Sequence, residues 1–413
     1  MNGSRKVPIG DVVESTKTWN PLRSASDEVF DYIDLSAIDQ DSKLIVGVRE
    51  VSCKEAPSRA RQLVGKGDII VSTVRPNLNG VAQVPEYLDG ATASTGFCIL
   101  RPRSSLIDGR FLFHWVKSPI FIADMVNKAT GASYPAVSDR IVLESILPLP
   151  SLEEQKRIAD ILDHAESLRA KRKAALAQFD ELIQSIYFDL FGDPESNPKK
   201  FHISALAEII QLRGGFAFKS NDYVNEGIPL VRIGEVNRGN VAKENACFLP
   251  YEYKDTYSQF IVKPGDMLMS LTGTTGKDDY GNVILLNDTF DLYFLNQRVA
   301  LFQSDENVLD KYYLLYFLRH PKVKIKLTAK SRGIRQANIS NGDVLELKIP
   351  LPPLSLQKEF ARRVESIEKL KTTHKASLAE LEELFASLQY RAFRGELSTT
   401  SKANEQSFEG VKI

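Results

Sequence analysis

Residues 151–193 read SLEEQKRIADILDHAESLRAKRKAALAQFDELIQSIYFDLFGD, and this stretch decides the fold because it occurs twice. The second copy, residues 353–395, reads PLSLQKEFARRVESIEKLKTTHKASLAELEELFASLQYRAFRG. Gln155-Lys156 aligns with Gln357-Lys358, so the copies lie 202 positions apart (357 − 155). A repeat this long, spaced by about half the chain, indicates a duplicated two-part unit and not a short-period solenoid.

Both copies have the periodicity of a long helix. Their apolar residues recur at alternating steps of three and four, which is the pattern of the a/d seam of a coiled coil. About 40 residues of helix, at 1.5 Å each, span roughly 60 Å. A helix of that length with one apolar seam needs a partner helix, and each copy is the obvious partner of the other.

The predicted seam has one polar position in each copy, Arg172 and His374. A polar seam residue can fix register and partner, although both side chains can equally reach water from the edge of the seam. We expect the other seam residues, above all the repeat-equivalent leucines, to be buried between the two helices. The full seam comprises Ile158, Ile161, Leu168, Arg172, Phe179, Leu182 and Ile186 in the first copy, and Phe360, Ile367, Leu370, His374, Leu381, Leu384 and Leu388 in the second.

The composition excludes some classes of protein. Lys and Arg together number 53, Asp and Glu also number 53, and the net charge is zero. This balance argues against a protein that holds nucleic acid by bulk charge alone, so any nucleic-acid surface must be local or shared with a partner. Cys53, Cys98 and Cys247 lack metal or redox spacing, which indicates reduced core residues. Without a signal peptide or a long apolar run, the chain is expected to be cytoplasmic and to cross no membrane.

The repeat also divides the rest of the chain into two similar regions. In the first, Phe97–Leu100 has the pattern of a strand, and Phe111–Lys128 predicts a helix that breaks at Pro119. The second region replays this order, with Tyr313–Phe317 and Pro321 at the equivalent places. We therefore predict an α/β (mixed α+β) fold with an internal pseudo-two-fold repeat. Its parts are a first domain (1–149), a first long helix (150–193), a linker (194–200), a second domain (201–349), a second long helix (350–397) and a polar, disordered tail (398–413).

The two domains share a strand framework but differ in two loops. Ser72–Asn77 reads STVRPN, whereas its counterpart Ser270–Thr275 reads SLTGTT. Likewise, Gly131–Tyr134 reads GASY, whereas Gly333–Gln336 reads GIRQ. One scaffold with different loops is expected if the two domains recognise different things.

The sequence shows no motif for catalysis or for a bound metal. Residues 273–277, GTTGK, superficially resemble a phosphate loop, but the first glycine is missing and Asp278 replaces the required Ser or Thr. The five histidines have no metal spacing. The Asn-Pro-Pro-aromatic motif of an amino-methyltransferase does not occur. These absences favour a binding protein over an enzyme.

Polar and planar side chains in the loops can read base edges in DNA. Arg suits guanine and Asn or Gln suits adenine, whereas a Lys on a phosphate positions the protein without specifying sequence. Exposed loops are polar in most proteins, and that explanation holds as well for any single residue. The candidate DNA contacts are Arg75, Asn77, Asn79, Lys128, Ser133 and Tyr134 in the first region, and Arg213, Lys219, Lys277, Lys330, Arg332, Arg335, Gln336 and Asn338 in the second.

Two divergent domains, each followed by a repeated Pro-Leu-Pro-x-Leu-x-x-Gln-Lys helix, resemble the specificity (S) subunit of a type I restriction–modification enzyme. The repeated segments Pro148–Lys156 and Pro350–Lys358 carry the resemblance, which covers nearly the whole chain. It implies two target recognition domains, each reading one half of a split double-stranded DNA target. It also implies that the two long helices pack antiparallel as a spacer.

The same resemblance implies partners and places the chemistry in them. The helices would help to bind two methyltransferase (modification) subunits, which carry S-adenosylmethionine and methylate adenine at N6. Restriction (motor–nuclease) subunits, which use ATP and Mg, would complete the enzyme. This chain itself is then expected to be non-catalytic and to hold no cofactor.

Two other functions stay open on the sequence alone. The chain can be the specificity portion of a fused restriction–methylation enzyme, which methyl transfer by the purified chain would reveal. It can also be a coiled-coil scaffold without DNA binding. That alternative explains the helices but not the duplicated domains with divergent loops.

Overall fold

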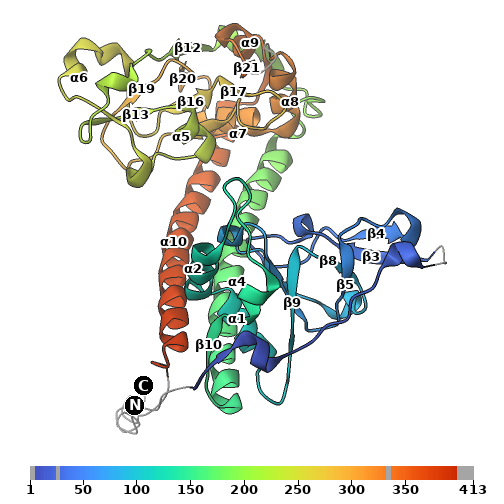
Figure 1. Ribbon diagram of the computed structural model, residues 1–413. Coiled ribbons are helices and arrows are strands. Elements are labelled where there is room, and N and C mark those ends of the chain that lie inside the picture. The colour runs from blue at the N-terminus through green and yellow to red at the C-terminus, as the bar shows by residue number, and fades with distance from the viewer. Residues whose placement is uncertain (1–4, 25–27, 332–335, 398–413) are drawn as a thin grey trace, which may run out of the picture. The chain divides into compact units, whose positions relative to one another are not determined.

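The computed structural model describes residues 5–24, 28–331 and 336–397, so the predicted tail, 398–413, lies outside them. The chain divides into two compact units, Met1–Lys173 with Ala376–Ile413, and Ala174–Lys375. Two long helices, α4 (Leu152–Phe191) and α10 (Leu354–Phe393), each contribute one segment to either unit (Figure 1). Each unit therefore holds one mixed α/β domain and a pair of helix segments.

The domain of the first unit contains two four-stranded sheets and three short helices. One sheet has the order β2 (Val13–Glu14), β9 (Phe97–Pro102), β6 (Ile69–Ser72), β7 (Val81–Gln83). The other has the order β4 (Arg49–Ser52), β3 (Val29–Ile33), β8 (Thr92–Ser94), β5 (Ala60–Leu63). The first strand, β1 (Arg5–Pro8), pairs antiparallel with β10 (Ile146–Leu149), directly before α4. The helices are α1 (Gly109–Val116), α2 (Pro119–Lys128) and α3 (Asp139–Leu143).

The domain of the second unit repeats this topology strand for strand. One sheet has the order β12 (Ile210–Gly214), β20 (Val299–Ser304), β16 (Met267–Ser270), β18 (Val283–Leu285). The other has the order β14 (Phe248–Leu249), β13 (Ile228–Val231), β19 (Tyr293–Leu295), β15 (Ile261–Val262), and β11 (His202–Ala205) pairs with β22 (Lys348–Leu351). The helices α7 (Lys311–Arg319), α8 (Pro321–Ala329) and α9 (Asn341–Leu345) match α1 to α3. Two more helices, α5 (Ile233–Arg238) and α6 (Tyr253–Thr256), and a strand pair, β17 (Thr272–Thr274) with β21 (Gln336–Asn338), complete the unit.

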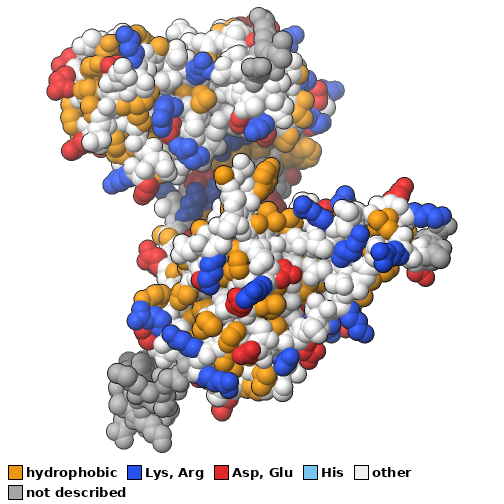
Figure 2. Space-filling view, in the orientation of Figure 1, with side chains coloured by type: hydrophobic (Ala, Val, Ile, Leu, Met, Phe, Trp, Pro, Cys, Tyr) orange, Lys and Arg blue, Asp and Glu red, His pale blue; other side chains and the backbone are white. Residues whose placement is uncertain are grey.

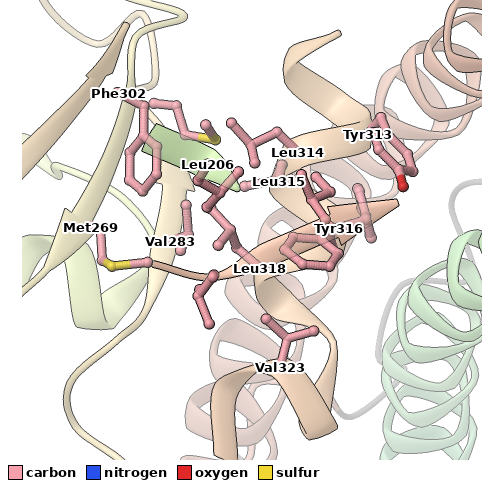
Figure 3. Close-up of a cluster of buried hydrophobic side chains, with 14 of the residues drawn as sticks. Leu206, Met269, Val283, Phe302, Tyr313, Leu314, Leu315, Tyr316, Leu318 and Val323 are labelled. Atoms are coloured by element: carbon pink, nitrogen blue, oxygen red, sulfur yellow. The ribbon is translucent and has the colours of Figure 1, made fainter. Parts of the chain in front are cut away.

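Each domain has one core between a sheet and the short helices and another between its two sheets. In the second unit, Leu314 and Leu318 of α7 pack with Met269, Val283 and Phe302 of the sheet (Figure 3). The predicted helix breaks are confirmed, because Pro119 and Pro321 stand at the first position of α2 and α8. There a proline loses no intrahelical hydrogen bond, whereas it would break a continuing helix.

A buried glutamine joins each long helix to the domain of its own unit. The side chain of Gln155 accepts a hydrogen bond from the backbone N–H of Asp108 (2.8 Å) and donates to the carbonyls of Leu106 (3.1 Å) and Pro150 (2.9 Å). The same three contacts recur in the second unit, from Gln357 to Asp310 (2.8 Å), Val308 (3.3 Å) and Pro352 (2.9 Å). The glutamine of the repeated motif is therefore the attachment point between helix and domain.

The helix segments run antiparallel in each unit. In the second unit, the rings of Phe179 and His374 lie 5.0 Å apart and those of Tyr187 and Phe360 lie 5.6 Å apart. Contacts further along α4 are therefore made with earlier residues of α10. In the first unit, the Arg169 guanidinium lies 4.5 Å from the ring of Phe385. The polar seam position of the second helix is thus occupied by a histidine in contact with an aromatic ring.

The seam prediction is wrong for the four repeat-equivalent leucines. Leu168, Leu182, Leu370 and Leu384 are 39%, 46%, 51% and 50% exposed. The residues that follow them, Arg169, Ile183, Lys371 and Phe385, form the contacts between the helices or lie buried instead.

The physical reason for this error is that two of the contact residues are cationic. Arg169 and Lys371 do not look apolar, so a search for apolar periodicity selects their leucine neighbours. In addition, seam residues such as Ile158, Phe360 and Ile367 are buried because they belong to the domain cores. The other predicted seam residues, Ile161, Arg172, Phe179, Ile186, His374, Leu381 and Leu388, are half-buried.

The predicted linker, 194–200, consists of turns, and acidic residues around it pair with α8. The carboxylate of Asp193 lies 2.5 Å from Lys322, and that of Glu195 lies 2.7 Å from Lys326. The hydrogen bond from Lys322 lowers the pKa of Asp193 to about 2. Within the parts of the chain that the structure describes, no helix has both the length and the apolarity needed to cross a bilayer.

Candidate nucleic-acid interface

The two divergent loops of each domain lie together. In the second unit, strand β17 pairs antiparallel with β21, which places Thr272 opposite Asn338 and Thr274 opposite Gln336. In the first unit, Val74 bridges Ala136, and the backbone N–H of Arg75 donates to the carbonyl of Pro135 at 2.7 Å. The segments that differ between the domains therefore form one surface in each unit.

In the first unit, this surface presents an arginine stacked on a tyrosine. The guanidinium of Arg75 lies 4.5 Å from the ring centre of Tyr134, and that ring is 67% exposed. Arg75 precedes a 3₁₀ turn, Pro76–Leu78, and has φ +50°, while Asn79 after the turn has φ +47°. Left-handed backbone at non-glycine residues costs energy and is concentrated at functional sites. The structure thus brings two predicted residues together at an exposed surface, Arg75 from a strained turn and Tyr134 from the neighbouring loop.

A hollow of about 280 Å³ opens beside this pair. Its lining combines apolar side chains with hydroxyl, amide, guanidinium and phenol groups that can donate or accept hydrogen bonds. The lining residues are Leu35, Ser36, Ile38 and Gln40 from the segment after β3, and Ser72, Val74, Arg75, Leu78, Gly80 and Tyr134 from the loops. The segment after β3 therefore borders the recognition surface, which the sequence did not indicate.

In the second unit, the described residues of the equivalent surface present two amide side chains. Gln336 and Asn338 are exposed on β21, and the hydroxyl of Thr272 donates to Oδ1 of Asn338 at 2.9 Å. Lys277 is exposed in the turn after β17. Asp279 accepts hydrogen bonds from the backbone N–H (2.7 Å) and hydroxyl (2.8 Å) of Thr274, and the backbone hydrogen bond lowers the pKa of Asp279.

A chain of side chains that sequence reasoning missed anchors this second surface. The amide of Asn237 on α5 donates to the backbone carbonyl of Asp279, and Asn282 donates to Oδ1 of Asn237 at 3.0 Å. Lys324 of α8 donates to Asn282 at 2.6 Å. On the same helix α5, Glu235 is 2% exposed and accepts from Arg232 (2.9 Å) and Arg238 (2.7 Å), whose guanidinium groups remain partly exposed. No periodicity or motif marks these residues, because each contact joins distant parts of the sequence.

The remaining candidates of the loops and of the ends of α2 and α8 differ in their exposure and contacts. Asn77 and Ser133 are exposed in the loops of the first surface, whereas the half-buried Asn79 donates to the carbonyl of Lys117 at 3.4 Å. Lys128 and Lys330, predicted to contact phosphates, pair with Asp124 (2.8 Å) and Glu346 (2.7 Å) and keep part of each side chain in solvent.

Two candidates of the second unit lie outside its loop surface. Arg213 is on β12 and donates to the carbonyl of Ile261 at 3.1 Å, and Lys219 precedes the 3₁₀ turn Ser220–Asp222. Arg332 and Arg335 lie outside the described residues.

One group of side chains in the first unit has the composition of a metal site. His114, Asp163 and Glu166 place ligand atoms within 4.8 Å of one another. However, the ammonium of Lys117 lies 2.7 Å from Glu166, and the guanidinium of Arg110 lies 3.0 Å from Asp163. Two cations of the protein itself therefore already balance these carboxylates, and the group serves to hold α1 against α4.

Charge is dispersed over the face of the molecule that Figure 2 draws. On the face drawn in Figure 2, Lys and Arg side chains alternate with Asp, Glu and uncharged residues over both units. This agrees with equal numbers of basic and acidic residues in the chain. Such a surface provides local contacts to an anionic ligand rather than a continuous basic track.

A family profile, the type I restriction modification DNA specificity domain, matches residues 1–178 and 198–383. The chain belongs to this family. The two matched segments correspond to the two repeats of domain and helix. The two matches to the specificity-domain family thus account for the duplicated framework.

Known members of this family are similar over most of the chain. The MjaVIII specificity subunit of a type I restriction enzyme from Methanocaldococcus jannaschii is 30% identical over 285 residues, 66% of either protein. A solved chain from work on complex assembly and conformational transition of the type I R-M system is 27% identical, with a TM-score of 0.58 over 96% of this chain and 99% of its own. The S subunit from M. genitalium, at 14% identity and a TM-score of 0.52 over 94% and 96% of the two chains, supports the fold alone.

The helices of this specificity-domain chain keep an apolar face exposed. Leu168 precedes the contact residue Arg169, and Leu384 precedes Phe385, so each leucine lies about 100° around its helix from the contact. Because the segments run antiparallel, this rotation brings both leucines to the same face of the first unit's helix pair. Leu182 and Leu370 have the equivalent place in the second unit. Each unit therefore presents one exposed leucine pair.

Proposed function

We propose that the chain is the DNA-recognition subunit of a type I restriction–modification complex, in which each unit reads one half of a split, asymmetric target. One observation carries this proposal. The same strand framework occurs twice, and the surface it supports carries Arg75 with Tyr134 in one unit and Gln336 with Asn338 in the other. Two domains with the same strand framework but different exposed side chains suit two different half-sites, separated by bases that neither domain contacts.

The side chains indicate how each surface would read DNA. A guanidinium can bind O6 and N7 of guanine, and a carboxamide can bind N6 and N7 of adenine. Lys128 and Lys330, each in a partly exposed ion pair, can turn to nearby phosphates and position the duplex. Arg75 is thus suited to guanine, and Gln336 and Asn338 are suited to adenine.

We assign the chemistry to partner subunits. The chain offers binding surfaces, and the methyl transfer from S-adenosylmethionine and the ATP- and Mg-dependent cleavage would belong to modification and restriction subunits. The exposed leucine pairs, Leu168 with Leu384 and Leu182 with Leu370, suit contact with an apolar surface of one modification subunit in each unit. Since the pairs are repeat-equivalent, two modification subunits per chain are expected.

Native mass spectrometry with saturating modification subunit tests this assembly. We expect two modification subunits per chain, and replacement of Leu182 and Leu370 by Ser should leave one. A one-to-one complex with the unchanged chain would overturn the assignment. The same double replacement at Ile120 and Val126, which are exposed on α2 and outside the helix pair, provides a matched control.

DNA affinity of the assembled complex tests the reading of bases. Gln336→Ala should weaken binding to the cognate site by about 1–3 kcal/mol and leave nonspecific DNA unaffected, if the amide makes a bidentate contact. Lys330→Met should weaken binding to all sequences alike and reduce the dependence on salt. Equal loss on all DNA for Gln336→Ala would exclude it as a base reader.

A further inference from the structure

The side chain of Lys43 ties a neighbouring segment to the recognition loop of the first unit. Its ammonium donates to the backbone carbonyl of Asn79 at 2.7 Å. Asn79 is the last residue of the turn that begins at Arg75. The contact therefore holds the loop that carries the exposed guanidinium of Arg75. Lys43 and Asn79 are 36 positions apart in the sequence (79 − 43).

Both residues of this contact have left-handed backbone, as does Arg75 at the start of the turn. Among the described residues, five non-glycine residues have positive φ, and Lys43 (+59°), Arg75 (+50°) and Asn79 (+47°) are three of them. Such a conformation persists only where the surrounding contacts determine it. Here those contacts are the hydrogen bond from Lys43, the donation of the Asn79 amide to Lys117, and the donation of the Arg75 N–H to Pro135.

The segment around Lys43 is itself closed by hydrogen bonds. The carboxylate of Asp39 accepts from the backbone N–H (2.6 Å) and hydroxyl (2.7 Å) of Ser42, and the backbone N–H of Lys43 donates to the carbonyl of Asp39 at 2.9 Å. This turn fixes the backbone of Lys43. A lysine whose backbone is fixed can hold the Asn79 carbonyl, and thereby the loop, in one position.

The environment of Lys43 suits a structural contact better than a phosphate contact. Burial, and the nearby charge of Lys117, lower the pKa of Lys43. The two lysines named as phosphate contacts differ, since Lys128 and Lys330 keep 45% and 39% of their side chains exposed. The Lys43 ammonium is committed to a backbone oxygen inside the unit.

We propose that Lys43 is a positioning residue for base reading by the first unit. By holding the Asn79 carbonyl, it fixes the turn from Arg75 to Asn79 and so keeps the Arg75 guanidinium stacked on Tyr134. This inference rests on the proposed function of the chain. Lys43 itself touches no base and no phosphate.

Binding of the assembled complex with modification subunits to three DNA duplexes tests this inference. The duplexes are the methylated target of the native complex, the target with the first unit's half-site replaced, and the target with the other half-site replaced. In Lys43→Met, the discrimination against the first replacement should fall about tenfold or more, while that against the second stays unchanged. The salt dependence of binding should also stay unchanged, because no phosphate contact is lost. The exposed Lys17 provides the control Lys17→Met, which should bind like the native complex.

A second substitution separates positioning from general damage. Lys43→Arg keeps a cationic hydrogen-bond donor at this position. It should therefore retain more discrimination at the first half-site than Lys43→Met. The unchanged second half-site shows that the variant folds and assembles.

Three results would overturn the inference. Weaker binding of Lys43→Met to all three duplexes, with reduced salt dependence, would make Lys43 a phosphate contact. Native discrimination in Lys43→Met would show that the tie is not needed for reading. If the native complex itself failed to discriminate at the first half-site, the proposed function of that unit would fall together with this inference.

Discussion

The ammonium of Lys371 on α10 lies 2.6 Å from the carboxylate of Asp180 on α4. The two positions 202 residues away, Arg169 and Glu382 (371 − 169 and 382 − 180), form an ion pair in the other unit, at 3.7 Å. The cation and the anion have exchanged helices between the two pairs. The duplication therefore includes the contacts between the helices as well as the domains, and both units join their helix segments in the same way.

This pair of contacts predicts a measurable coupling between the helices. In a double-mutant cycle with Lys371→Met and Asp180→Ala, we expect a favourable coupling of about 0.5–1 kcal/mol, because Asp180 is exposed and solvent screens the pair. The longer Arg169–Glu382 pair should give less. Urea denaturation of the native chain, the two single variants and the double variant measures the coupling, and a second cycle at Arg169 and Glu382 measures the other pair. A coupling of zero between Lys371 and Asp180 would contradict the geometry.

Loss of the glutamine that joins helix to domain should be costly in either unit. Gln357→Leu leaves the N–H of Asp310 and the carbonyls of Val308 and Pro352 without their partner. Unsatisfied buried groups cost about 1–3 kcal/mol each, so we expect a loss of about 2–4 kcal/mol in the free energy of unfolding after partial relaxation. Gln178→Leu, at an exposed position of α4, should change it by less than about 0.5 kcal/mol. Equal effects would show that the buried contacts are unimportant.

The exposed leucines should matter little for folding. Leu182→Ala is expected to change the free energy of unfolding by at most about 0.5 kcal/mol, as at other surface positions. Its neighbour Ile183 is 0% exposed, and Ile183→Ala should cost about 2–5 kcal/mol because it leaves a cavity. Thermal and urea unfolding of both variants measure these losses. A larger loss for Leu182→Ala than for Ile183→Ala would show that Leu182 is the residue buried between the helices.

The contact of Asp193 with Lys322 should stabilise the second unit only above acidic pH. The folded-state pKa of Asp193, about 2, is below its ordinary value of 3.8, so this stability is present above about pH 4 and is lost as the pH falls toward 2. Solvent screening limits it to less than about 1 kcal/mol. Asp193→Asn should therefore be less stable than the native chain at pH 7 and equally stable at pH 2. Asp288→Asn, at an exposed position, should show no such dependence.

The sequence was sufficient for the duplicated fold because repetition is visible without a structure. Pro119 and Pro321 marked helix breaks through their missing N–H. The equivalent loops were found by aligning the two domains, at offsets of 198 (270 − 72) and 202 (333 − 131) positions. The structure places these loops together in both units, as the prediction of one recognition surface per domain requires.

The contacts that position the site were not predictable in the same way. Apolar periodicity cannot assign Lys371 to a helix contact, because Lys371 makes that contact by a hydrogen bond to Asp180 on the other helix. Lys43 likewise has no local pattern, and its role depends on a carbonyl in a distant turn. Long-range polar contacts of this kind depend on the folded geometry alone.

The two duplicated domains are proposed to recognise their half-sites independently of each other. Exchange of residues 201–349 for those of a relative, followed by genome-wide mapping of methylated adenines in cells that carry the complete system, tests this proposal most directly. Half-sites read by domains on one face of B-DNA lie about one helical turn, roughly 34 Å, apart. We predict that the exchange changes one half of the methylated sequence and leaves the other half and the spacing as they were. A change in both halves together, or in neither, would contradict the account.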